Sequence, residues 1–295
     1  MTMSSSEDHP LLPTTEARPT WTATFEGVVR NLALSREAGW ILARDDTGWL
    51  TLLDERGKRQ AQRQASHVVA IDSADNGSAF VVGDSQGMVY WLAPDLMPRW
   101  ERRVTQPVAG LAIDAHGQLL AVSDTRGELT LFSKSGRTIW TVQLPRALEH
   151  LRFGVEKPML IGSADFGLVV ALDREGQIVW QDRLVSHVGS LDVSGDLDVI
   201  LLACFSDGLW KYAAKGPTGE QLATKEPCQL LSLSYSGGVV LASGLRKRFS
   251  LLDLTGRVLG EQTLEASVTA MKMGATADYA VLGLSNGRLF FLQWR

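Results

Sequence analysis

The chain has 295 residues, of which 45% are hydrophobic and 21% are charged, and its net charge is −4. This composition is typical of a folded globular protein, and the acidic balance argues against a general nucleic-acid-binding protein. No run of about 20 apolar residues occurs, so no membrane insertion is expected.

The first 17 residues differ in composition from the rest of the chain. They are rich in Ser, Thr, Pro and acidic residues, which predicts a disordered tail. They also have neither the positive charge nor the apolar core of a signal peptide. We therefore expect residues 1–17 to form a tail, residues 18–295 to form one domain, and the protein to be cytoplasmic.

The remainder of the chain repeats with a period of about 40 residues. The period is carried by glycines that precede apolar runs, at Gly48, Gly87, Gly127, Gly167, Gly208 and Gly287, and by apolar residues at Ile71, Leu111, Leu151, Leu191, Leu231 and Met271. A second glycine series occurs at Gly136, Gly176, Gly216 and Gly256. Repeats of this length indicate a solenoid or a propeller.

Each repeat predicts four short strands. In the third repeat these are residues 107–114, 118–124, 127–133 and 138–144, separated by Gly, Asp and Ser turn residues. No long stretch has a helical period. Four antiparallel strands in every 40 residues predict the blade of an all-β propeller.

The number of blades follows from where the repeats end. Six complete repeats cover residues 28–265, and a seventh supplies only three strands before the chain ends. Outer strands carry tryptophans at Trp100, Trp140 and Trp180, and we expect Trp21 in residues 19–27 to take the missing place. The predicted fold is a seven-bladed β-propeller of four-stranded antiparallel blades, closed by an N-terminal strand.

Residues 171–180, ALDREGQIVW, contain the pattern A-x-D-x-x-x-G-x-x-x-W, with Gly176 and Trp180 at its last two fixed positions. This pattern resembles the tryptophan-docking motif of quinoprotein (PQQ-dehydrogenase-like) repeats. The third repeat keeps the glycine and the tryptophan, as Gly136 and Trp140. The whole chain from residue 18 onward resembles a quinoprotein-like or, more loosely, a WD-repeat-like propeller.

The resemblance implies a structural role for the motif and not a cofactor site. Quinoprotein dehydrogenases have eight blades, a calcium site and a disulfide of adjacent cysteines. Here seven blades are predicted, and the only cysteines, Cys204 and Cys228, are not adjacent. We therefore expect no quinone, no calcium and no other cofactor.

The innermost strands place a mixed ring of residues at the propeller axis: Asp72, Ala112, Arg152, Asp192, Ser232 and Lys272. Converging ionisable groups can shift one another's pKa values, as in an enzyme. The ring has no histidine and no repeated carboxylate, which favours interblade ion pairs, such as Arg152 with Asp192. None of the five histidines has metal-ligand spacing, and no catalytic residue or metal site is expected.

The loops between the second and third strands are mostly small polar turns, except in repeats four to six. There they carry aromatic and basic side chains: Phe166, Phe205, Arg246, Lys247 and Arg248. This composition is typical of interface hot spots. Alternatively, the phenylalanines pack between blades and the basic residues are solvated. We hypothesise a partner-binding patch.

Two classes of function remain. One is a noncatalytic scaffold that presents loops to partner proteins as a subunit of a larger complex. The other is a propeller enzyme, lactonase- or hydrolase-like, with its site on the central axis. Such an enzyme should place several Asp, Glu, Asn or His residues at matching inner positions. The repeated inner positions are mostly Leu, Ile and Met, which favours the scaffold. An outer-membrane assembly lipoprotein of quinoprotein-like shape would need a signal peptide and a lipobox, which we do not find.

Overall fold

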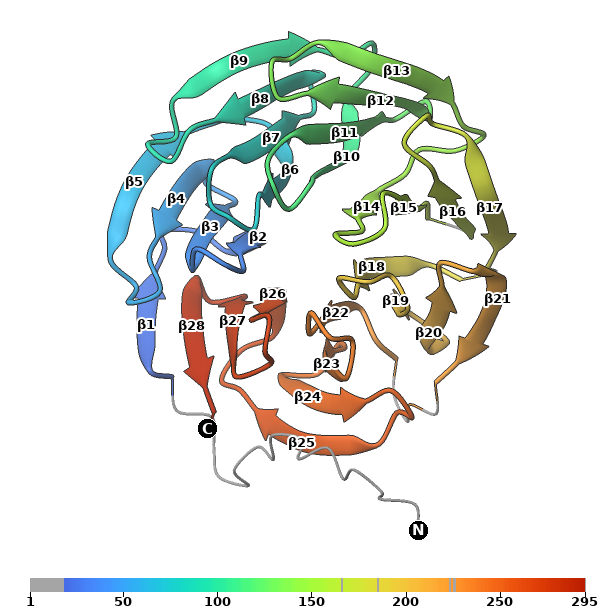
Figure 1. Cartoon of the computed structure of the whole chain (residues 1–295). Coiled ribbons are helices and arrows are strands. Elements are labelled where there is room, and N and C mark those ends of the chain that lie inside the picture. Colours follow the sequence, from blue (N-terminus) through green and yellow to red (C-terminus); the bar gives the residue numbers. More distant parts are fainter. Residues whose placement is uncertain (1–18, 166, 185, 223, 225–226, 295) are drawn as a thin grey trace.

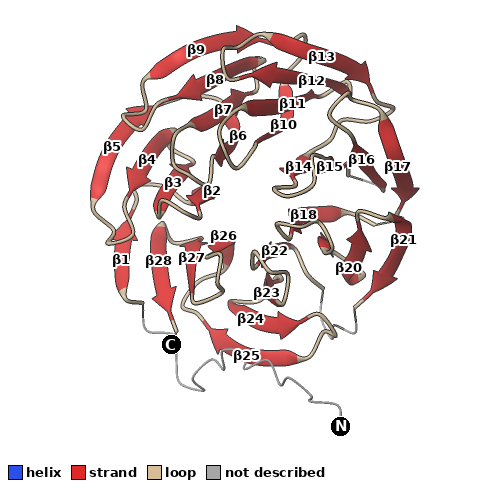
Figure 2. Cartoon of the chain, in the orientation of Figure 1, coloured by secondary structure: helices blue, strands red, loops and turns tan. Residues whose placement is uncertain are grey.

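Antiparallel sheets arranged around a common axis make up the part of the chain that the structure describes (Figure 1). The structure is a computed structural model and describes residues 19–294 except 166, 185, 223 and 225–226. Among these residues there are strands and loops but no helix (Figure 2), hence none that could span a bilayer. The predicted tail, residues 1–17, lies outside the described residues.

Seven four-stranded sheets form the seven blades, which we number in chain order. The first three blades contain, from the innermost strand outward, β2 (Val29–Ser35), β3 (Trp40–Asp45), β4 (Trp49–Leu53) and β5 (Arg59–Gln64); β6 (Val68–Ser73), β7 (Phe80–Asp84), β8 (Met88–Leu92) and β9 (Pro98–Arg103); and β10 (Val108–Ile113), β11 (Leu119–Asp124), β12 (Glu128–Ser133) and β13 (Thr138–Gln143).

The next three blades have the same order. They contain β14 (His150–Phe153), β15 (Leu160–Ser163), β16 (Leu168–Leu172) and β17 (Ile178–Arg183); β18 (Val188–Val193), β19 (Ile200–Cys204), β20 (Gly208–Ala213) and β21 (Gly216–Gln221); and β22 (Leu230–Leu233), β23 (Val239–Ser243), β24 (Arg248–Asp253) and β25 (Val258–Thr263). Blade 7 contains β26 (Val268–Met273), β27 (Tyr279–Leu284), β28 (Arg288–Gln293) and β1 (Trp21–Thr24).

Burial explains why central and outer strands differ in sequence. A central strand such as β11 is covered on both faces by neighbouring blades, and Leu120, Ala121 and Val122 are all at most 1% exposed. Continuous apolar runs are therefore needed there. The outer strand β13 alternates between exposed and half-buried residues, because only one of its faces meets the next blade.

The N-terminal strand closes the ring, as predicted. β1 pairs antiparallel with β28, with Trp21 opposite Phe291. The two rings are stacked with their centroids 5.2 Å apart. The first and last described strands thus complete one blade, which removes the open edges that the two strands would otherwise present.

Tryptophans of outer strands join neighbouring blades. Each indole N–H donates to a backbone carbonyl 34 residues further on, in the following blade: Trp21 to Glu55 (2.8 Å), Trp100 to Lys134 (2.9 Å), Trp140 to Arg174 (2.7 Å) and Trp180 to Ala214 (3.0 Å). We call the turn that receives an indole, between the third and outer strands of a blade, a dock. These hydrogen bonds link the outer strand of one blade to the dock of the next.

The docks have a glycine where the indole packs. A Cβ atom added to Gly57, Gly136 or Gly176 would lie 2.7, 3.0 or 2.9 Å from an indole carbon of the preceding blade. These glycines also have φ angles of +77°, +74° and +80°, which side chains disfavour. The expected series fails at Gly216, where φ is not positive; there Trp180 stacks on Tyr212, with centroids 5.9 Å apart.

Two further junctions are filled in other ways. Between blades 1 and 2 the tryptophan position is Ala61, and the dock carries the fully buried Leu96 at φ +59° in place of glycine. Between blades 6 and 7 the buried Trp294 packs in one cluster with Phe249 and Leu251. A large apolar side chain thus occupies six of the seven junctions in the described chain.

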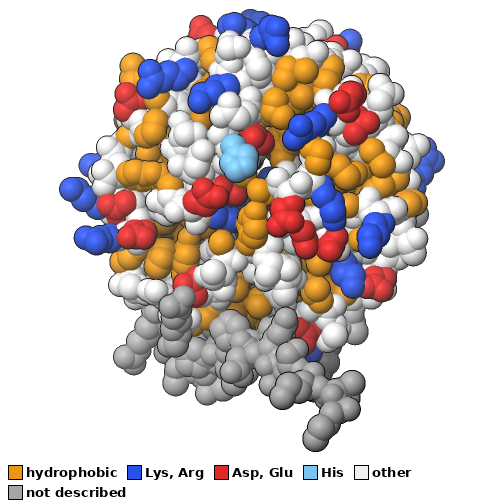
Figure 3. All heavy atoms as spheres, in the orientation of Figure 1, with side chains coloured by type: hydrophobic (Ala, Val, Ile, Leu, Met, Phe, Trp, Pro, Cys, Tyr) orange, Lys and Arg blue, Asp and Glu red, His pale blue; other side chains and the backbone are white. Residues whose placement is uncertain are grey.

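The surface of the ring carries both signs of charge. On the face seen in Figure 3, Lys and Arg side chains alternate with Asp and Glu, and neither sign dominates. This mixture agrees with the net charge of −4. That face therefore offers no broad basic region of the kind that binds nucleic acid.

Candidate functional site

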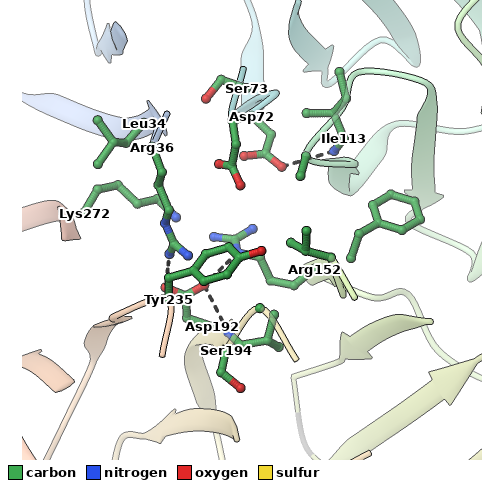
Figure 4. Close-up of a pocket in the computed structure, with 16 residues that line it drawn as sticks. Leu34, Arg36, Asp72, Ser73, Ile113, Arg152, Asp192, Ser194, Tyr235 and Lys272 are labelled. Carbon is green, nitrogen blue, oxygen red and sulfur yellow. Dashed lines mark hydrogen bonds and ion pairs between the residues drawn. The ribbon is translucent and has the colours of Figure 1, made fainter. Parts of the chain in front are cut away.

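Charged side chains from blades far apart in the sequence converge at the axis (Figure 4). The innermost strands β6, β14, β18 and β26 contribute Asp72, Arg152, Asp192 and Lys272. The ring predicted from the 40-residue spacing therefore exists at these four positions. Its other members differ: Ala112 is fully buried in the core, and Ser232 is a buried hydrogen-bonding residue.

Asp192 is the hub of this axial site. Its side chain is 3% exposed and lies 3.0 Å from the Arg36 guanidinium and 3.4 Å from that of Arg152. It also accepts hydrogen bonds from the Ser232 hydroxyl and the Leu233 N–H. Burial alone would raise the pKa of the Asp192 carboxyl, but the nearby positive charges and the N–H donor hold it well below its usual range.

Arg36 is the site residue that sequence reasoning missed. It follows β2 in a loop, three positions beyond Ala33, which the repeat places at the ring position of blade 1. Its side chain is 13% exposed and crosses the axis to blade 5. Burial lowers the pKa of Arg36, yet Asp192, Asp75 and Asp72 together raise it above its ordinary value. In the sequence Arg36 lies in a charged loop, where a solvated side chain would be expected.

Polar ring residues also connect the backbones of adjacent blades. Asp72, Asp192 and Ser232 each accept a hydrogen bond from a backbone N–H 41 residues further on, at Ile113, Leu233 and Met273. The donor–acceptor distances are 3.1, 2.9 and 3.1 Å. These side chains therefore satisfy N–H groups that the blades cannot pair internally, which is a structural task.

Two groups of the axial site have pKa values near neutrality. Burial raises the pKa of Asp75 to about 6, with Arg36 opposing and Asp72 adding to the shift. Burial also lowers the pKa of Lys272 to about 8, and the positive charge of Arg152 lowers it further. Groups perturbed in this way occur in active sites and in structural ion networks alike.

Other buried titratable groups are held in their neutral forms. His150 in β14 lies 3.1 Å from the Val188 carbonyl through Nε2, and burial lowers its pKa to about 4. Burial likewise raises the pKa of Cys204 and Cys228 to about 12. These thiols stay protonated near neutral pH and are poor nucleophiles. Among the described residues, no three His, Cys, Asp or Glu side chains are grouped as a metal site.

The axial site is small and its charges are balanced. Arg36, Arg152 and Lys272 face three carboxylates in a cavity of about 60 Å³. Ligand pockets usually measure about 300–1,000 Å³. The cavity has room for a few water molecules, and the opposing charges neutralise each other without a ligand.

The loops predicted to form a partner-binding patch lie on blades 5 and 6. Phe205 follows β19 and is 38% exposed, and Leu245, exactly 40 residues later, is 64% exposed. Sequence reasoning did not single out Leu245. Arg246 and Lys247 are exposed beside it, and the Lys247 Nζ donates to the Glu265 carbonyl.

Two residues of the predicted patch stand apart from these loops. Arg248 begins β24, is half-buried, and pairs with Glu261 of its own blade at 3.0 Å. It is therefore committed to a structural contact. Phe166 lies outside the described residues.

A comparison with protein families gives a match over the C-terminal part of the chain. Residues 125–293 match the family model described as outer membrane protein assembly factor BamB. The match covers more than half of the chain, from the third blade to β28. No curated protein matches the chain.

Proposed function

The chain belongs to the family of the outer membrane protein assembly factor BamB, and on that premise we propose that it is a noncatalytic scaffold. Its rigid ring presents loops to partner proteins, and it acts as a subunit of a larger complex. Membership of a family of assembly factors supports a role in protein interaction.

The observation that carries this proposal is the exposed pair Phe205 and Leu245. They occupy equivalent positions on neighbouring blades, and both keep a large apolar side chain in solvent. Arg246 and Lys247 border them. Aromatic side chains and arginine are enriched at protein interfaces. We define the partner patch as these four residues.

An enzyme with a site on the axis is the alternative proposal. Asp75 and Lys272 favour it, because their pKa values suit proton transfer near neutral pH. The small cavity and the mutual pairing around Asp192 favour the scaffold. Hydrolysis of lactones or esters by the purified protein, lost on Asp75→Asn, would favour the enzyme.

The scaffold is tested by capture of partners from native extract with the double variant Phe205→Ala, Arg246→Glu. We expect it to lose partners that the unaltered protein retains, at an unchanged thermal midpoint. The matched control is Ser85→Ala, Arg126→Glu, which alters the equivalent exposed loop positions on blades 2 and 3. Full retention by the first variant would remove the partner patch from consideration.

A further inference from the structure

The junction between blades 5 and 6 differs from the other six. Its outer strand β21 carries Glu220 where β17 carries Trp180. In blade 4, Trp180 lies opposite Ala171 across the strands, and in blade 5 Glu220 lies opposite Lys211. Glu220 forms an ion pair with Lys211 and its side chain is 61% exposed. It is therefore turned to its own blade and to solvent.

The dock on blade 6 nevertheless keeps its geometry. Gly256 has a φ angle of +84°. Asp253 Oδ1 accepts hydrogen bonds from the N–H groups of Thr255 and Arg257, at 2.9 and 3.1 Å. Asp173 closes the occupied dock of blade 4 in the same way, through Glu175 and Gln177. The same turn is thus built on blade 6 opposite a strand that supplies no indole.

An open groove lies at this junction. Its cavity volume is about 670 Å³, within the usual size of a ligand pocket, and its lining includes Gly256, Leu252, Val258, Leu209 and Cys228. Two arginines at the groove are already paired, Arg248 with Glu261 and Arg257 with Asp253. The groove therefore presents an apolar floor without an uncompensated charge among its described lining residues.

No side chain of the described residues fills this dock, and we call it the vacant dock. We propose that it binds the indole side chain of a tryptophan carried by an extended segment of a partner protein. The four occupied docks show which chemistry fits. In each, an indole ring packs at the turn, and its N–H donates to a backbone carbonyl 34 residues beyond the tryptophan. For position 220 the corresponding carbonyl is that of Leu254. The inference deepens the proposed function, because the occupant comes from a partner protein.

The test uses N-acetyl-L-tryptophanamide as the probe, with binding to the full chain followed by saturation-transfer NMR. The dock is filled internally by the double variant Lys211→Ala, Glu220→Trp, which recreates the Ala171–Trp180 pair of blade 4. We expect the unaltered protein to bind the probe and the filled variant to bind at least tenfold more weakly. The filled variant should also have a higher thermal midpoint, because its own indole closes the groove.

Two controls separate docking from other effects. Lys211→Ala alone removes the ion pair without adding a ring, and Gln221→Trp places an indole on the opposite face of β21. Both should bind the probe as the unaltered protein does. N-acetyl-L-leucinamide should bind more weakly than the tryptophan probe, because its side chain has neither an aromatic ring nor an N–H to donate to the dock.

Three results would overturn the proposal. They are absence of probe binding to the unaltered protein, equal binding by the filled variant, and a dimer that the filled variant converts to monomers, which would make a second copy the occupant. The partner patch is tested separately by its own variant. Failure of the probe with continued loss of capture by Phe205→Ala, Arg246→Glu would therefore remove the vacant dock and leave the scaffold.

Discussion

Asp192 shows how a buried charge is tolerated at the axis. Its carboxylate has lost its water shell, and two guanidinium groups, a hydroxyl and a backbone N–H replace it. Such a cluster is stabilising only while it is complete, since removal of one partner of a buried ion pair typically costs about 3–5 kcal/mol. The residues come from blades 1, 4, 5 and 6, so the cluster couples the two halves of the ring.

Asp75 should make stability depend on pH. Burial raises its folded-state pKa from 3.8 to about 6. Between pH 4 and 6 the unfolded chain loses this proton while the folded chain keeps it, so the free energy of unfolding falls as pH rises. Asp75→Asn cannot ionise, so its stability relative to the unaltered protein should rise by about 2 kcal/mol between pH 4 and 7.

Urea unfolding at the two pH values measures this difference. The control is Asp198→Asn, because the Asp198 side chain is 61% exposed in its ion pair with Lys157. Its relative stability should change by less than about 1 kcal/mol. If the difference in free energy of unfolding between Asp75→Asn and the unaltered protein stays constant with pH, the pKa of Asp75 is not raised in the folded protein.

Trp140 provides a test of the interblade docks. Trp140→Ala removes a ring packed on Gly176 and should lower the free energy of unfolding by about 3 kcal/mol, the lower end for large aromatic residues because Trp140 is half-buried. Trp140→Phe keeps an aromatic ring but loses the hydrogen bond to the Arg174 carbonyl. The loss of this bond should lower the free energy of unfolding by about 1 kcal/mol, in addition to any effect of the smaller ring on packing. Denaturant unfolding measures both. Equal stability of Trp140→Ala and the unaltered protein would contradict the dock.

Sequence spacing could locate Asp72, Arg152, Asp192 and Lys272, because one period places each at the same point of a blade. It could not locate Arg36 or Asp75, which lie in loops after the innermost strands, where the period no longer fixes direction. Their role arises only when the ring closes and brings blade 1 opposite blade 5. The sequence therefore predicts the strand residues of the axial site but not its loop residues.

At the scale of strands, the outer ones carry the information that distinguishes the blades. The central strands of the blades are similar buried apolar runs, and their regular spacing is enough to predict seven blades. Between blades 1 and 2, Ala61 stands at the tryptophan position and Leu96 at the glycine position of the dock. This replacement was not predictable, since a leucine rarely adopts a φ of +59°. Packing between two blades selects it, because the buried leucine fills the space that the missing ring leaves.

β1 should be essential for a stable ring. A chain that begins at Val28 lacks Trp21, its stacking on Phe291 and the whole pairing to β28. We expect such a chain to aggregate or to have a clearly lower thermal midpoint, because β28 becomes an unpaired edge. A chain that begins at Arg18 is the control and should melt like the full chain. Equal midpoints for the two would contradict closure by β1.

At the scale of the molecule, the ring is held by side-chain and backbone contacts between blades. The described residues contain no cluster suited to a metal ion, and the axial charges neutralise one another. We therefore expect a chelator to leave the thermal unfolding curve unchanged. A rise of several degrees on adding calcium would instead reveal a site that binds the folded state.

Closure by β1 also sets an order of events during synthesis. Among the described strands the ribosome makes β1 first and β28 last, so blade 7 can form only after the strands of the other six blades have been made. Translation proceeds at roughly 5–20 residues per second. β1 therefore stays without its partner strand for about 14–54 s while the other blades are being made, and nascent chains are exposed to wrong pairing throughout that interval.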